Sequence, residues 1–189
     1  MINPVKNYSN KIKIAVSGHR DVLDSKELRK FMEDVILLIQ RKYPSENFRI
    51  FSCMAEGADL ILTDELITGL RADLVAVLPL SIEEHEKDFI SGSNLRIFTR
   101  QIRNAYEIIL PAHQTHRPQC YYAANQIMMS KVDSLVVVWD GMPSRGLGGT
   151  ASVVELARAR MLPIAWIRLK KGVPVELRIE NYEGTFKGG

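Results

Sequence analysis

The sequence predicts an α/β protein, a Rossmann-like three-layer sandwich with a mostly parallel central sheet. Short runs rich in Val and Ile recur along the chain, and helical segments of about a dozen residues separate them. Such alternation is typical of βαβ units, in which helices cover both faces of a parallel sheet. In addition, glycine-rich turns directly follow several of the strand-like runs.

The expected strands are short, apolar and rich in β-branched residues, as buried strands of a parallel sheet are. In chain order they fall at residues 11–17, 48–52, 73–78, 106–110, 134–139 and 163–168. The C-terminal tail is less regular, and residues 175–179 are expected to add a strand at an edge of the sheet.

The expected helices lie between these strands. Asp24 and Glu27 have the spacing of a capping box, and apolar residues then repeat at helical steps up to Pro44. A second helix is expected to end at Gly69, because glycine commonly follows the last turn of a helix. Helical patterns occur at residues 59–67, 119–131 and 151–161, and in two pieces within the polar stretch 81–103.

Length and composition favour a single domain over residues 1–189, with a core at about 11–168 and a tail at 170–189. The apolar runs are only strand-length and the N-terminus does not resemble a secretion signal, so we expect a cytoplasmic protein without a membrane partner. The 25 basic and 22 acidic residues are mixed along the chain, which makes nucleic acid an improbable partner. Cys53 and Cys120 fit no recurring metal or redox spacing and are expected to be reduced thiols.

Polar and glycine-rich turns after three of the expected strands are the candidate binding elements. The carboxyl ends of parallel strands meet at one edge of the sheet, where such folds bind ligands, so we expect these turns to converge on one cleft. The candidate ligand-binding residues are Gly18, His19, Arg20, Glu56, Gly57, Asp59, Pro79, Asp140, Gly141, Arg145, Gly146, Gly148, Gly149 and Thr150.

The strongest of these turns is RGLGGT, at residues 145–150, directly before an expected helix. Glycines allow close approach of the backbone to a ligand, and the free N–H groups of the helix favour an anion. Thr150 is suited to cap the helix and to donate its hydroxyl to a phosphate, and Arg145 to make a bidentate contact. The alternative is a flexible connection in which Thr150 is an ordinary cap.

The other turns leave alternatives open. Glu56 is suited to bind a ribose hydroxyl if it faces the cleft, whereas Asp59 is as plausible an N-cap as a ligand contact. Arg20 is the better phosphate ligand of the first turn, and His19 is equally suited to orient a neighbouring loop. His113, His116 and Cys120 have only a loose metal-like spacing in a surface loop, so we expect neither a metal nor a cofactor.

Five motifs together resemble the SLOG superfamily, which joins the Lonely Guy family with the DNA-processing protein A family. They are VSGHR (16–20), AEGAD (55–59), LPL (78–80), VVWDG (137–141) and RGLGGTASVVELA (145–157), in order over most of residues 11–168. The resemblance implies a Rossmann-like nucleotide-binding fold, commonly a homodimer, that serves some members as an enzyme and others as a sensor of nucleotide-derived signals in bacteria.

One departure from that family bears on function. Lonely Guy phosphoribohydrolases place a catalytic glutamate three residues after the threonine of the GT motif, where this chain has Val153. Glu155 follows two residues later, about 200° around the helix, and is expected to point away. We therefore expect a domain that binds or senses a nucleotide-like, phosphate-bearing small molecule. The alternative is an N-glycosidic hydrolase acting on nucleoside monophosphates, with Glu56 or Asp140 in place of the missing glutamate.

Overall fold

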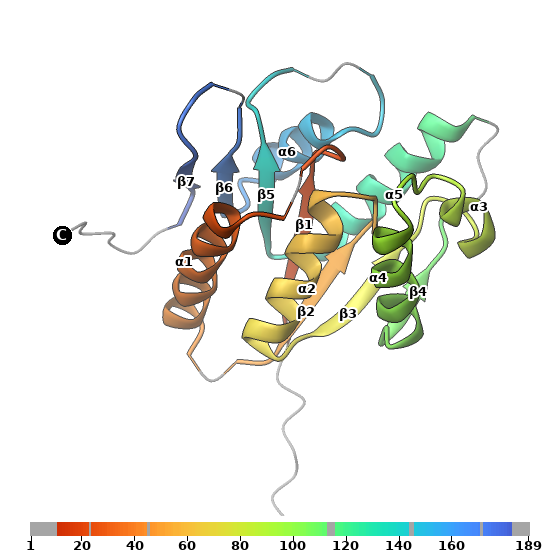
Figure 1. The fold of residues 1–189 in the computed structure, drawn as a ribbon. Helices are drawn as coiled ribbons and strands as arrows, with labels where there is room; N and C mark the ends of the chain where they lie inside the picture. Colours follow the sequence, from red (N-terminus) through yellow and green to blue (C-terminus); the bar gives the residue numbers. More distant parts are fainter. Residues whose placement is uncertain are drawn as a thin grey trace, which may run out of the picture.

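The computed structural model describes residues 11–22, 24–44, 46–112, 116–143, 146–170 and 172–182, which form a sheet flanked by helices (Figure 1). The strands are β1 (Ile12–Gly18), β2 (Phe48–Ser52), β3 (Asp73–Val77), β4 (Glu107–Ile109), β5 (Ser134–Trp139), β6 (Ile164–Arg168) and β7 (Glu176–Glu180). The helices are α1 (Lys26–Lys42), α2 (Ala58–Leu70), α3 (Ile82–Glu86), α4 (Gly92–Arg103), α5 (Arg117–Lys131) and α6 (Thr150–Ala159).

The sheet has the strand order β4-β3-β2-β1-β5-β6-β7. All neighbouring strands are parallel except β7, which runs antiparallel to β6 and forms an edge. This arrangement confirms the predicted fold class. The chain builds the sheet outward from β1 as far as β4, then returns through α5 and adds β5 on the other side of β1. The order of strands therefore reverses between β1 and β5.

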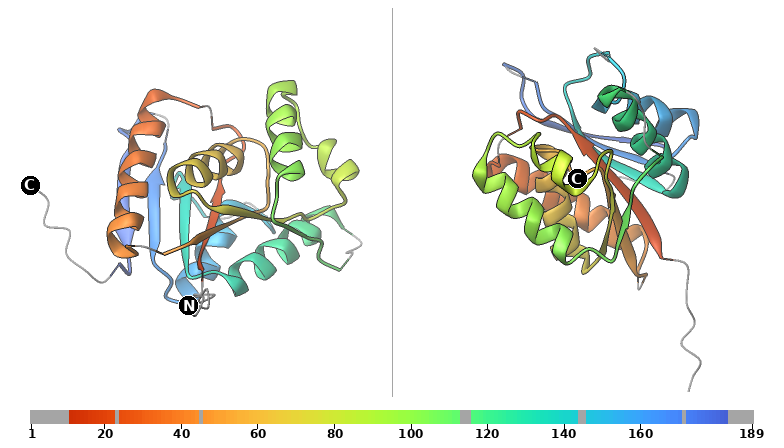
Figure 2. Two further views of the ribbon diagram at one scale, coloured as in Figure 1. Left: turned by 90° about the horizontal axis from the view of Figure 1, so that it is seen from below. Right: turned by 90° about the vertical axis from the view of Figure 1, so that its right-hand side faces the viewer.

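The core lies on both faces of the sheet, because successive side chains of a strand point to opposite faces. Ala15 of β1 and Val137 of β5 belong to the apolar cluster beneath α5 and α6. Val16 and Val136 belong to the cluster beneath α1 and α2, and Phe98 of α4 centres a third cluster. Figure 2 shows α5 and α6 on the opposite side of the sheet from α2 and α4, which gives the three layers.

Two helix boundaries differ from the sequence-based expectation. Ser25, not Asp24, is the N-cap of α1, and its hydroxyl accepts a hydrogen bond from the backbone N–H of Leu28. Gly69 lies inside α2, where a Cβ would come within 2.5 Å of the Ile36 Cδ1 atom on α1. That glycine therefore permits close packing of two helices and does not end one. None of the helices in the described ranges is long and apolar enough to cross a lipid bilayer.

Candidate functional site

Two cavities open where the strand order reverses, at the carboxyl ends of β1 and β5. The larger, of about 760 Å³, lies between the turns after β1, β5 and β6, and we name it the β5–β6 cavity. The smaller, of about 590 Å³, lies between the ends of β1 and β2 and the start of α5, and we name it the β1–β2 cavity. Four residues line both: His19, Leu147, Gly149 and Thr150.

The first turn of α6 separates the two cavities. Gly149 is the N-cap, in an extended conformation with φ −83° and ψ 173°, and no side chain caps the helix. Thr150 is already the first helical residue, so the expectation that its hydroxyl caps α6 is wrong. Among the hydrogen bonds between described residues, none uses the backbone N–H of Thr150 or Ala151. These N–H groups are donors without a protein acceptor there.

The loop before α6 is docked onto α5. Gly148 has φ +83°, and a Cβ at that position would lie 2.8 Å from the Cβ of Tyr121. The Asn125 side chain donates a hydrogen bond of 3.0 Å to the Gly148 carbonyl and accepts one from the Cys53 thiol. Gly146 lines the β5–β6 cavity, whereas Arg145 lies outside the described residues.

The turns after β1 and β2 interlock through two glycines. A Cβ at Gly18 would lie 2.4 Å from the Cβ of Ala58, and a Cβ at Gly57 would lie 2.3 Å from the carbonyl oxygen of Arg20. The backbone N–H of Ala58 also donates to the His19 carbonyl at 3.0 Å. Both glycines are therefore required by the contact between the turns, which holds the backbone of His19 and Arg20 in place.

Asp59 is buried at the base of the β1–β2 cavity. It is the second residue of α2, whose N-cap is Gly57, so the alternative of an Asp59 N-cap is wrong. Its two carboxyl oxygens accept hydrogen bonds from the backbone N–H of Gly18 at 2.9 Å and of Ala55 at 3.3 Å. Burial outweighs these bonds and raises the pKa of Asp59 to about 7.

Glu56 lines neither of the two cavities. Its carboxyl oxygens accept hydrogen bonds from the backbone N–H groups of Ile90 and Ser91 and from the side chain of Asn94. Burial would raise the pKa of Glu56, but these bonds and the charge of Arg20 lower it overall. Glu56 thus anchors the start of α4, and its position does not suit the ribose contact expected from the sequence.

The turn after β5 is held by His19 and Asp140. The His19 Nε2 atom accepts a hydrogen bond of 3.1 Å from the backbone N–H of Asp140 and lies 3.1 Å from its Oδ1 atom. The same Oδ1 atom accepts from the backbone N–H of Met142. Both His19 and Asp140 line the β5–β6 cavity. Gly141 packs against Trp166 instead, and neither it nor Pro79, which follows β3, lines either of these two cavities.

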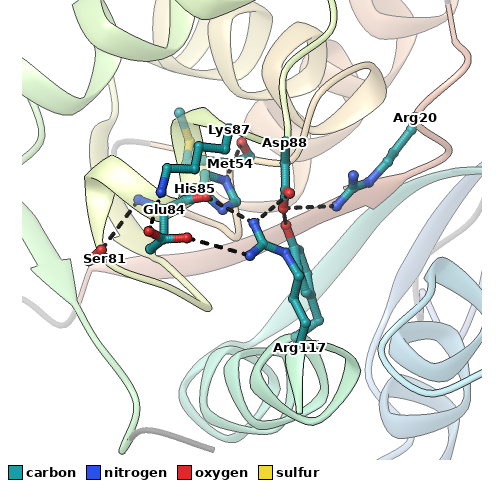
Figure 3. Close-up of polar contacts among 9 residues, drawn as sticks. Arg20, Met54, Ser81, Glu84, His85, Lys87, Asp88 and Arg117 are labelled. Carbon is teal, nitrogen blue, oxygen red and sulfur yellow. Dashed lines mark hydrogen bonds and ion pairs between the residues drawn. The ribbon is translucent and has the colours of Figure 1, made fainter. Parts of the chain in front are cut away.

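A polar cluster that was not predicted from the sequence lies at the rim of the β1–β2 cavity. The Asp88 carboxylate accepts hydrogen bonds from Arg117, at 2.5 Å, and from the Tyr121 hydroxyl. The Arg20 guanidinium lies 3.8 Å from the same carboxylate, so Asp88 sits between two arginines (Figure 3). The expected helix began at residue 119, whereas α5 begins at Arg117, and the Pro118 that follows is a signal that marks a helix start.

Electrostatics favour the ionised form of Asp88. Burial alone would raise its pKa, but the hydrogen bonds from Tyr121 and Arg117 and the charge of Arg20 lower it. Burial and the neighbouring Asp88 carboxylate raise the pKa of Tyr121, so its hydroxyl remains a donor at neutral pH. Within the described ranges, no three His, Cys, Asp or Glu side chains are placed to hold a metal ion.

The fold and the site define an α/β protein with a Rossmann-like sheet and two cavities at the point where the strand order reverses. No family model and no curated protein matches the chain. Among solved structures, the X-ray structure of TM1055, a Northeast Structural Genomics Consortium target, is similar with a TM-score of 0.48 and 13% sequence identity. That likeness covers 81% of this chain and 72% of the other.

Proposed function

We propose that this protein binds a phosphate-bearing, nucleotide-like small molecule at the start of α6 and acts as a sensor or binding domain. One observation carries the proposal: the uncapped first turn of α6 lies between two cavities at the switch point of the sheet. Open parallel sheets bind their ligands at this place. Backbone N–H groups at a helix start, together with the helix dipole, favour a phosphate there.

The surroundings of this helix start support a ligand of nucleotide size. The two cavities, of about 760 and 590 Å³, fall within the usual range of about 300–1,000 Å³ for small-molecule sites. Cationic side chains line both of them, with Lys170 in the β5–β6 cavity and Arg20 and Arg117 in the β1–β2 cavity. A phosphate at Thr150 therefore has room on either side for a sugar or a base.

Binding without turnover is favoured by what replaces the catalytic glutamate of the phosphoribohydrolases in the SLOG superfamily. Val153, at the corresponding position, is buried in the apolar cluster beneath α6, and Glu155 is exposed. The two substitute carboxylates are already engaged: Glu56 binds the start of α4, and Asp140 binds the backbone of Met142. No acid or base thus stands at the position that the phosphoribohydrolases use.

A pair of substitutions at Thr150 tests the proposal. Thr150→Pro removes one of the free N–H groups, and proline is tolerated at the first position of a helix, after an extended residue such as Gly149. Thr150→Ala removes only the hydroxyl and is the matched control. We expect Thr150→Pro to weaken binding of AMP or inorganic phosphate by about tenfold or more, the effect of one charge-assisted hydrogen bond.

Calorimetric titration measures these affinities, and thermal unfolding shows whether each variant stays folded. If the wild-type protein binds neither AMP, ADP-ribose nor inorganic phosphate at millimolar concentration, the proposed function is wrong. It is also wrong if a phosphate ligand binds equally well to the wild-type protein and to a folded Thr150→Pro variant.

Asp59 supports a second candidate function, hydrolysis of an N-glycosidic bond. Its carboxyl lines the β1–β2 cavity and has a pKa of about 7, the range in which a general acid or base works best at neutral pH. Incubation with nucleoside monophosphates, followed by chromatography for free base, tests this candidate. Release of base by the wild-type protein and its loss in Asp59→Asn would replace the binding proposal with the enzymatic one.

Self-association remains a prediction that follows from the resemblance to the SLOG superfamily. Analytical ultracentrifugation of the full chain, with and without AMP, measures it directly. A monomer at all concentrations would contradict the expected homodimer and leave the binding proposal unaffected.

A further inference from the structure

Asp88 occupies the position of an anion between three donors that line the β1–β2 cavity. Arg117, at the first position of α5, binds one carboxylate oxygen at 2.5 Å, and the Tyr121 hydroxyl binds the other. Arg20 approaches the second oxygen at 3.8 Å and stacks its guanidinium over the Tyr121 ring, 5.2 Å from the ring centre. Two guanidinium groups and a phenol are the donors with which proteins bind phosphate and carboxylate groups.

The segment that carries Asp88 is short and lies between α3 and α4, in the crossover from β3 to β4. Asp88 follows α3, a helix of five residues, and its neighbour His85 is tied to the carbonyl of Met54 at 3.0 Å. The carboxylate thus enters the cavity rim from one side, while Arg20 and Arg117 come from β1 and α5 (Figure 3). Its partners thus follow β1 or lie on α5, whereas Asp88 itself lies on the short segment between α3 and α4.

We propose that Arg20, Arg117 and Tyr121 form a second anion subsite for the ligand, and that Asp88 fills this subsite in the free protein. The inference rests on the proposed function and narrows it: the ligand carries two anionic groups, one for the start of α6 and one for this subsite. Binding of the second group displaces the Asp88 carboxylate and releases the segment after α3.

The two subsites are joined by a single side chain. The Cβ of Tyr121 lies next to Gly148, at the loop that leads into α6, and its hydroxyl binds Asp88. Tyr121 therefore contacts the loop before α6 at one end of its side chain and Asp88 at the other. A pyrophosphate, or a nucleoside with phosphates at two positions, carries the two anionic groups that the two subsites require, whereas a single phosphate fills only one.

The two arginines at the rim face carboxylates in the free protein. Arg20 and Arg117 face Asp88, and Glu84 lies 3.8 Å from Arg117 but is half-exposed and bound to Lys87. When the ligand displaces Asp88, two arginines become available to one incoming anion. Both arginine side chains are about half exposed, at 50% and 41%, so they are accessible from the cavity.

Calorimetric titration with inorganic phosphate and with pyrophosphate tests this inference on the full chain. We expect the wild-type protein to prefer pyrophosphate modestly, because the second group must compete with Asp88. Asp88→Asn removes that competitor and should tighten pyrophosphate binding by about tenfold, which is the effect of one charge-assisted hydrogen bond. The affinity for inorganic phosphate should change much less. Arg117→Gln should abolish the preference for pyrophosphate.

Glu84→Gln is the matched control, since it removes a carboxylate near Arg117 that does not line the cavity. It should leave the ratio of the two affinities unchanged. The inference is overturned if Asp88→Asn leaves that ratio unchanged or lowers pyrophosphate affinity, because Asp88 then only positions the arginines. Failure of every protein to bind either anion would overturn the proposed function as well, so the two failures are distinguishable.

Hydrogen exchange on the wild-type protein gives a second measurement that needs no variant. Saturating pyrophosphate should increase amide exchange across residues 82–88, because the displaced Asp88 no longer holds that segment. Inorganic phosphate should protect the start of α6 without this increase. Equal protection of residues 82–88 by both anions would contradict the displacement of Asp88.

Discussion

At Asp59, burial raises the pKa of the carboxyl group, and two backbone hydrogen bonds oppose this effect. An aspartate has a pKa of about 3.9 in an unfolded chain, whereas burial raises that of Asp59 to about 7. The folded state therefore holds this proton more tightly than the unfolded state. Its contribution to stability is complete below the unfolded pKa and is lost as the pH rises through the folded pKa.

The replacement Asp59→Asn should flatten this dependence on pH. Between about pH 4 and pH 7, the free energy of unfolding of the wild-type protein should fall relative to the variant by up to about 1.4 kcal/mol per pH unit. His85, whose pKa burial lowers, titrates in both proteins and cancels in the comparison. Urea unfolding at about pH 5, 6 and 7 measures the difference, and a difference that stays constant with pH would contradict the raised pKa.

Substitutions at Gly57 and Gly172 distinguish the cost of an unfavourable backbone conformation from the cost of a steric clash. Both have positive φ, at +89° and +76°, but only Gly57 faces the backbone of Arg20, and Gly172 has open space around it. Gly172→Ala should cost about 1–2 kcal/mol of stability. Gly57→Ala should cost about 1–3 kcal/mol more, because the turn must also move away from Arg20. Equal losses in urea unfolding would show that the two turns do not interlock.

Single residues were predictable where backbone geometry required them and less so where side chains choose partners. Gly57 lies in the turn after β2, as its position predicted, and Gly18, expected just after the first strand, is the last residue of β1. Glu56 has the chemistry of a ribose ligand, but three donors at the start of α4 bind it first. Those donors are more than 30 residues away in sequence, so no local pattern reveals them.

At the scale of elements, α6 shows why a family motif does not transfer its chemistry. The first residues of α6 line the cavities. Val153, the fourth residue of the helix, is already buried in the apolar cluster between α6 and the sheet. A carboxylate introduced at that position would be buried without a partner and would not reach a ligand. The helix itself was predicted, but its start was misplaced by one residue because Gly149, which has no side chain, is the cap.

The substitution Val153→Glu tests this reading of α6. It should destabilise the protein by about 3 kcal/mol or more, because an unpaired carboxylate enters the apolar core, and it should release no base from nucleoside monophosphates. Glu155→Gln, on the exposed side of the same helix, should change stability by less than about 0.5 kcal/mol. A stable Val153→Glu protein that hydrolyses AMP would show that this position faces the ligand.

At the scale of the whole molecule, the strand pattern was predictable but the position of the site within the sheet was not. Every expected strand is present, including the C-terminal edge strand β7. The decisive pairing, β1 with β5, joins residues about 120 apart in sequence, and it alone brings the turn of His19 beside that of Asp140. Arg117 stands at the start of α5 and Asp88 lies between α3 and α4, so their contact joins residues 29 apart in sequence, and no local signal specifies it.

Because the clusters of the core share one sheet, the described part of the chain should unfold as one cooperative unit. The two tryptophans, Trp139 and Trp166, stack at 5.0 Å in the cluster beneath α5 and α6, and the first also lines the β5–β6 cavity. Tryptophan fluorescence should therefore follow the same urea transition as far-ultraviolet circular dichroism, which reports all helices. A phosphate ligand at 100 times its Kd should shift both curves together by about 2.7 kcal/mol. Separate transitions, or a ligand shift seen by fluorescence alone, would show that the α4 side of the sheet folds independently of the cavities.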